Sequence, residues 1–264
     1  MANVLPFDDQ VSVIGSLAEG MSIRAIERMH GIHRDTVMRL GVRIGRGRER
    51  VLDGVMHNLN SDLIQLDELW GFVGKKQKHV TETDSNDLGD VWTFVSIDAE
   101  SKVVPAFRVG KRDGQTANAF VQDLASRLPN RVQISTDALA AYVDAIERGF
   151  GGDVDYGQIV KTFDSTDPLP ASRRYSPPEV VSVRKTIIVG NPNKDLISTS
   201  YIESQNLTVR MHCRRLTRLT NAFSKKLENF KAAVALHFGY YNLCKRHKTV
   251  KTAPAVAAGL IARP

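Results

Sequence analysis

The chain has 264 residues, of which 42% are hydrophobic and 25% are charged, and it carries a formal net charge of +7. It has no apolar run of about 18 residues and no charged-then-apolar leader, so we expect a soluble protein without a membrane span or an export signal. Its two cysteines exclude a zinc site made of cysteines alone, and they favour small buried side chains in a reducing compartment.

Basic residues gather in two segments of the chain. Residues 20–50 contain eight arginines against three acidic residues, and residues 204–251 contain eleven lysines and arginines against one glutamate. The remainder is therefore net acidic. Phosphate backbones are common partners of such basic segments, and an acidic middle is what a cation-binding site requires.

Residues 1–50 predict a small all-α domain of three helices. Ser22 is a favourable N-cap for the second helix, and Gly31 is a favourable stop. A third helix over residues 36–45 follows a short turn, which is the helix-turn-helix pattern. We interpret it as a DNA-binding domain; the alternative is a helical protein-interaction module. The glycines and arginines of residues 45–50 predict a flexible basic linker.

The helix-turn-helix interpretation assigns DNA contacts to the third helix and the residues beside it. The residues that would face the major groove are His33, Arg34, Thr36 and Arg39. The residues that would meet phosphates are Arg43, Arg46 and Arg48.

Residues 62–163 alternate between strand patterns and helix patterns. The expected strands cover residues 62–73, 91–98, 103–109, 131–136 and 158–163, and the expected helices cover residues 113–128 and 139–149. The order β-β-β-α-β-α-β predicts an α/β domain with a ribonuclease-H-like, mixed five-stranded sheet flanked by helices. We assign this domain to residues 62–249, after a linker at 51–61 and before a C-terminal tail at 250–264.

Residues 164–199 are expected to form an insertion in this domain. Prolines break its first half, and residues 180–189 predict a strand or a hairpin. Contact with DNA and contact with a second protomer both remain open as its role.

Residues 198–226 fit one long amphipathic helix. Ile202, Val209 and Leu216 fall on one stripe, whereas Glu203 and Arg210 fall on the opposite side. One interpretation is a solvated basic face with a single acid. The other is a catalytic carboxylate at the mouth of a groove lined by phosphate-binding arginines.

Three acidic residues stand at the expected ends or middles of these elements: Asp67, Asp137 and Glu203. Each has a simpler explanation alone, since Asp137 could cap a helix and the adjacent Glu68 could be a solvated edge charge. Together they suggest a shared site, because several buried like charges are costly unless divalent cations neutralise them.

Four stretches of the chain resemble the DDE transposases of bacterial insertion sequences, and in particular the insertion-sequence-one family. They are LDELWGFVGKK (66–76), STDALAAY (135–142), YIESQNLTVRMHCRRLTRLTNAFSKKLENF (201–230) and YYNLCKRHKTVKTAPAVAAGL (240–260). The resemblance implies a Mg²⁺-dependent transposase in which Asp67, Asp137 and Glu203 are the catalytic residues and the metal ligands. Two ions are expected, and Mn²⁺ is expected to substitute.

The same resemblance implies that the protein cuts the ends of an element and joins their 3′-hydroxyls to target DNA. Its partners would be double-stranded DNA and a second copy of the chain or a higher oligomer, in a nucleoid-associated cytoplasmic location. Further DNA contacts are expected from Arg210, Arg214, Arg215, Arg218, Lys225, Lys226, Lys245, Arg246 and Lys248. The alternatives are a ribonuclease-H-like nuclease or resolvase, and an inactive DNA-binding regulator.

Overall fold

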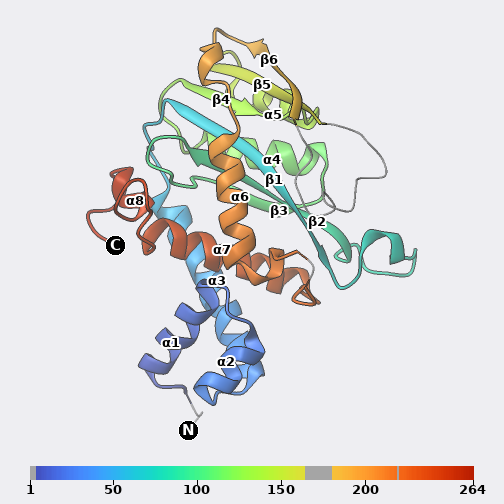
Figure 1. The fold of residues 1–264 in the computed structure, drawn as a ribbon, viewed down its shortest axis with the longest axis vertical. Coiled ribbons are helices and arrows are strands. Elements are labelled where there is room, and N and C mark those ends of the chain that lie inside the picture. The colour runs from blue at the N-terminus through green and yellow to red at the C-terminus, as the bar shows by residue number, and fades with distance from the viewer. Residues whose placement is uncertain (1–3, 164–179, 219) are drawn as a thin grey trace.

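The computed structural model describes residues 4–163, 180–218 and 220–264, and it consists of an N-terminal three-helix unit and a larger α/β body (Figure 1). The helices are α1 (Phe7–Ala18), α2 (Ile23–His30), α3 (Arg34–Val55), α4 (Gly114–Ala125), α5 (Ala141–Phe150), α6 (Ser200–His212), α7 (Leu227–Leu243) and α8 (Pro254–Ala257). The strands are β1 (Leu63–Val73), β2 (Gly89–Asp98), β3 (Phe107–Gly110), β4 (Val132–Thr136), β5 (Val154–Phe163) and β6 (Val180–Val189). None of the helices in these ranges combines the length and the apolar character needed to cross a bilayer.

The strands form one mixed sheet in the order β3-β2-β1-β4-β5-β6. Strands β1, β4 and β5 are parallel, whereas β2, β3 and β6 pair antiparallel with their neighbours. The prediction of a mixed sheet flanked by helices is confirmed, and the arrangement is compatible with a ribonuclease-H-like fold. The predicted number of five strands is wrong, because the later part of the expected insertion adds β6 to the edge of the sheet. The first half of that insertion, residues 164–179, lies outside the described residues.

Helices cover both faces of the sheet (Figure 1). On one face Leu66 and Phe94 pack with Phe120 of α4 and with α5. On the other face Leu69 packs with Val209 of α6 and with α7. Alternate residues of β1 therefore enter different cores, as the two-residue period of a strand requires.

The three-helix unit has a small core of its own, made by Val13, Ile26, Val37 and Leu40. The predicted signals at the ends of α2 are confirmed. The Ser22 hydroxyl accepts the Ala25 amide hydrogen bond at 3.2 Å, and Gly31 ends the helix in the left-handed conformation at a φ of 66°.

Helix α3 is longer than the sequence suggests. It runs without a break to Val55, so the prediction of a flexible linker over residues 45–50 is wrong. Gly45 is buried because α3 packs against α7 there, and a Cβ at Gly45 would overlap the carbonyl of Ala232. Arg46 also forms an ion pair with Glu228 of α7 at 2.7 Å. The glycine thus serves close helix packing and not flexibility.

The prediction of one helix over residues 198–226 is also wrong. Helix α6 ends at His212, Cys213 is extended, and a 3₁₀ turn, η4 (Arg214–Leu216), follows. The Thr217 hydroxyl donates to the Arg210 carbonyl at 2.9 Å and so satisfies part of the helix end. Arg214 and Arg218 therefore do not extend the face of α6 that carries Glu203.

Candidate metal centre

The pairing of β1 with β4 brings two of the predicted acids level with each other. The parallel ladder ends at the pair of Gln65 with Ser135. Asp67 and Asp137 each follow two residues later in the chain. Both carboxylates therefore lie where the two strands separate, which is the position that their sequence pattern predicts.

A third carboxylate, Glu68, joins them. One oxygen each of Asp67, Glu68 and Asp137 can be chosen so that all lie within 4.8 Å of one another. The side chains approach from different sides, since Asp67 contacts Asn206 of α6 and Glu68 contacts Tyr142 of α5. Adjacent strand residues on opposite faces reach one site because the sheet opens between β1 and β4.

Asp67 is the most perturbed member of the cluster. It accepts hydrogen bonds from the Asn206 side-chain amide at 2.7 Å and from the Glu68 backbone amide at 2.8 Å. Burial, followed by the like charges of Glu68, Asp137 and Glu203, raises its pKa from 3.8 to about 7. A bound cation would relieve this accumulation of negative charge.

Glu68 is held by an arginine from the segment before α4. The Arg112 guanidinium donates two hydrogen bonds to Oε1, at 2.9 and 2.6 Å, and the Tyr142 hydroxyl donates to Oε2 at 3.3 Å. The side chain is only 2% exposed, so the interpretation of Glu68 as a solvated edge charge is wrong. Burial and the nearby Asp137 raise its pKa, whereas Arg112 opposes this rise.

Asp137 directly follows β4. Its Oδ1 accepts the Leu139 amide hydrogen bond at 3.0 Å, and helix α5 begins only at Ala141. Asp137 therefore orders the turn before α5 and does not occupy the N-cap position. Its second carboxylate oxygen takes no part in this hydrogen bond.

Glu203 lies beside the cluster on α6 and is not part of the three-residue group. It is about half exposed, accepts a hydrogen bond from the Thr199 hydroxyl at 2.6 Å, and forms an ion pair with Lys161 of β5. Its charge nevertheless contributes to the raised pKa of Asp67. The structure thus brings Asp67 and Asp137 together with Glu68, and it places Glu203 close by with a different partner.

Arg210 is a predicted phosphate contact whose guanidinium interacts electrostatically with Asp67 of the cluster. Burial and the positive charge of Arg218 lower its pKa, while Asp67 raises it. Its Nη1 has no hydrogen-bond partner among the described residues. Arg215 also has a structural role, because its Nη1 donates to the carbonyls of Ala222 and Phe223 at 2.9 and 3.5 Å.

Several of the other predicted DNA contacts already have partners. Arg46 pairs with Glu228, Arg43 donates to Gln10 at 2.7 Å, and Lys245 contacts Glu19 at 3.3 Å. Arg48 packs over Gly239. The exposed positions are His33, Arg34, Arg39, Arg218, Lys225, Lys226, Arg246 and Lys248, whereas Thr36 and Arg214 are partly buried.

Four residues of the site were not singled out from the sequence: Arg112, Tyr142, Lys161 and Asn206. Asn206 was accessible to sequence reasoning, because it follows Glu203 by three residues and hence lies on the same side of α6. Arg112 and Lys161 come from distant segments, and only the tertiary fold brings them to the acids.

The donor set of the cluster consists of carboxylate oxygens, which suit hard divalent cations such as Mg²⁺ or Mn²⁺. No protein-family model matches the chain, and no curated protein matches it. The acidic cluster, the cationic residues around it and the sequence motifs are therefore the features that bear on function.

Proposed function

We propose that the chain is a DNA transposase that uses divalent cations, with two Mg²⁺ ions expected and Mn²⁺ able to replace them. The observation that carries this proposal is the meeting of Asp67, Glu68 and Asp137 within 4.8 Å at the opening between β1 and β4. Phosphoryl transfer at bound cations requires no nucleophilic serine or cysteine.

Bound cations of this kind would activate a water or a 3′-hydroxyl and would stabilise the leaving oxygen in phosphoryl transfer. The residues of the chain would hold the cations and orient the DNA. Asp67 and Asp137 provide the central oxygens, and Arg112 fixes the carboxylate of Glu68. Arg210, whose guanidinium interacts with the charge of Asp67, would place positive charge for a DNA phosphate beside the acids.

Glu203 completes the set in this proposal, as the third ligand that the sequence motif suggests. Its present partners are Lys161 and Thr199. A move of Glu203 from Lys161 toward the cluster would bring further negative charge close to Asp67, and a bound cation would be needed to offset that electrostatic cost.

The three-helix unit would recognise the ends of the element. In this proposal α2 and α3 form a helix-turn-helix, and exposed residues at the start of α3, such as His33 and Arg39, read the major groove. Transposition joins paired ends, so the active form would be a homodimer or a larger assembly on double-stranded DNA, located at the nucleoid.

A strand-transfer assay tests the proposal. The substrates are duplex oligonucleotides that carry the inverted repeats flanking the reading frame, together with a target duplex and Mg²⁺ or Mn²⁺. We expect joined product from the unmodified protein, and we expect Asp67→Asn, Asp137→Asn and Glu203→Gln to retain DNA binding and to lose both cleavage and joining. The matched control is Asp144→Asn, because Asp144 is an exposed acid on α5.

Each result separates the candidate functions. Cleavage without joining would identify a nuclease or resolvase, and specific binding without cleavage would identify a regulator. Full activity in any one of the three acid variants would remove that residue from the site.

A further inference from the structure

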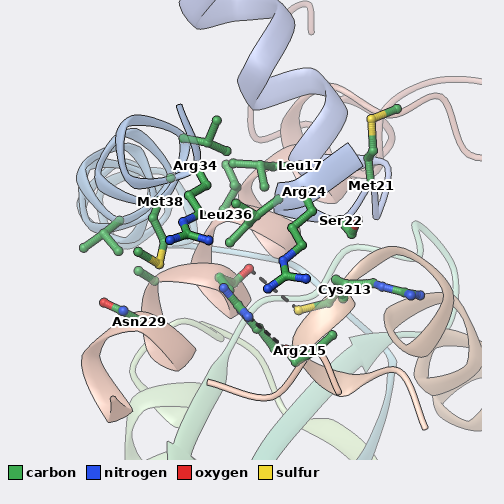
Figure 2. Close-up of a pocket in the computed structure, with 18 of the residues that line it drawn as sticks. Leu17, Met21, Ser22, Arg24, Arg34, Met38, Cys213, Arg215, Asn229 and Leu236 are labelled. Atoms are coloured by element: carbon green, nitrogen blue, oxygen red, sulfur yellow. Dashed lines mark hydrogen bonds between the residues drawn. The ribbon is translucent and has the colours of Figure 1, made fainter. Parts of the chain in front are cut away.

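A cavity separate from the acidic cluster lies between the three-helix unit and the segment that leads from α6 into α7 (Figure 2). Its volume is about 710 Å³, which is in the range of small-molecule sites. Apolar side chains from both sides form much of its wall, among them Leu17, Met38 and Leu236. None of the residues of the acidic cluster lines it.

The cavity contains an excess of positive charge. Figure 2 shows the guanidinium groups of Arg24, Arg34 and Arg215 directed into the same space, from α2, α3 and the α6–α7 connection. Within the described part of the chain, no carboxylate forms an ion pair with any of the three. Asp35 also lines the cavity, and its carboxylate lies 3.8 Å from His33. Convergent guanidinium groups without counter-charges are suited to a phosphate.

A buried histidine adds a second, independent indication of a ligand. His237 of α7 lines the cavity, is only 4% exposed, and has no hydrogen-bond partner for either ring nitrogen within the described residues. Burial, with smaller contributions from His212 and Lys245, lowers its pKa to about 3, while Glu19 opposes this shift. The ring is therefore neutral near pH 7 and offers one donor and one acceptor. Buried polar groups are rarely left unsatisfied, so a ligand that bonds to this ring would remove a cost.

We propose that this cavity binds one nucleotide, with the phosphate at Arg24, Arg34 and Arg215 and with the base between the apolar walls. His237 would bond to an edge of the base. The cavity has the volume of a small-molecule site, which does not admit a duplex, so the nucleotide is either free or unpaired at the end of a strand. The strand-end source rests on the proposed transposase function, whereas the free nucleotide does not.

Calorimetric titration of the full chain with dAMP and dTMP tests the proposal. Deoxyadenosine and inorganic phosphate serve as probes of the two halves of the ligand. We expect a mononucleotide to bind at least tenfold more tightly than either half, because the apolar wall and the guanidinium groups act on one molecule. The double variant Arg24→Ala/Arg34→Ala should lose at least tenfold in affinity. The matched control is Arg28→Ala, an exposed arginine of α2 outside the cavity, which should change affinity less than twofold.

The role of the histidine is tested by His237→Phe, which keeps an aromatic ring in place. We expect at least a fivefold loss of mononucleotide affinity with unchanged binding of inorganic phosphate, and circular dichroism will check that the variant folds. The source of the nucleotide is then tested by comparing a blunt duplex with one that carries a single unpaired 3′ nucleotide. Preferential binding of the unpaired end that needs Arg24 and Arg34 supports the strand-end source, and equal binding of both duplexes supports the free nucleotide.

The proposal is overturned if no mononucleotide binds saturably, or if Arg28→Ala weakens binding as much as the double variant does. These results are independent of the acidic cluster, because Asp67→Asn should not alter mononucleotide affinity. Loss of strand transfer in that variant with retained mononucleotide binding would keep the two sites distinct.

Discussion

Replacing Asp67 by asparagine should stabilise the protein, and increasingly so as the pH rises. Burial and neighbouring carboxylates raise the pKa of Asp67 from 3.8 to about 7 in the folded chain. Between these values the unfolded chain has already lost the proton that the folded chain keeps, so stability falls as the pH rises. The penalty reaches about 1.5 kcal/mol near pH 5 and about 4 kcal/mol near pH 8.

Asparagine removes this penalty at every pH, but it can replace only one of the two oxygens that accept hydrogen bonds from Asn206 and Glu68. That loss is about 1 kcal/mol and does not depend on pH. The difference in unfolding free energy between Asp67→Asn and the unmodified protein should therefore grow by about 2.5 kcal/mol from pH 5 to pH 8.

Urea denaturation of both proteins across this pH range measures the difference, since the titration of groups distant from the site cancels in the comparison. Saturating Mg²⁺ at pH 8 should reduce the advantage of the variant, because the cation offsets the charge that asparagine deletes. A difference that stays constant with pH would refute the reasoning, because Asp67 would then titrate as an ordinary surface acid.

Three further variants test other parts of the structure. Lys161→Met removes the ion-pair partner of Glu203, so half-maximal cleavage should require less Mg²⁺ in a metal titration; a higher requirement would show that Lys161 assists. Gly45→Ala should destabilise by about 1–3 kcal/mol in urea denaturation, because its Cβ would overlap the Ala232 carbonyl. In its control, Gly47→Ala, the added Cβ meets no neighbouring atom of the described residues, and this variant should stabilise by about 0.5–1 kcal/mol. Arg39→Ala should weaken binding to element ends by about 1–3 kcal/mol in a fluorescence titration, and an equal loss on random DNA would make Arg39 a phosphate contact.

The sheet was predictable because its strands carry strong local patterns. Strand β1 alternates between two cores, and β4 leads directly into Asp137, so topology alone brings Asp67 and Asp137 together. The strand boundaries were less predictable. Strand β3 begins only at Phe107, because the preceding segment bonds to side chains, as when the Val104 amide donates to Asn242 at 3.0 Å. A local pattern contains no information about such distant partners.

The errors at the site have a common physical cause. The period of a strand predicts that Asp67 and Glu68 face opposite sides, and they do, but the gap between β1 and β4 lets both carboxylates reach Asp137. Likewise, the apolar stripe of residues 198–226 fits a continuous helix, although Cys213 breaks it and turns Leu216 into the core. Burial of an apolar residue satisfies the same pattern whether the helix continues or ends.

Helix α3 connects the two halves of the proposed activity. It passes without a break from exposed Arg34 and Arg39 to Gly45, where its backbone meets Ala232 of α7. Helix α7 in turn packs beneath the same sheet face on which Asp67 meets α6. Independent rotation of the three-helix unit would therefore separate α3 from α7 and disrupt a buried contact. In the proposed transposase, the duplex held at the start of α3 would thus have a fixed register relative to the acidic cluster, so end recognition would also select the phosphate that is cut.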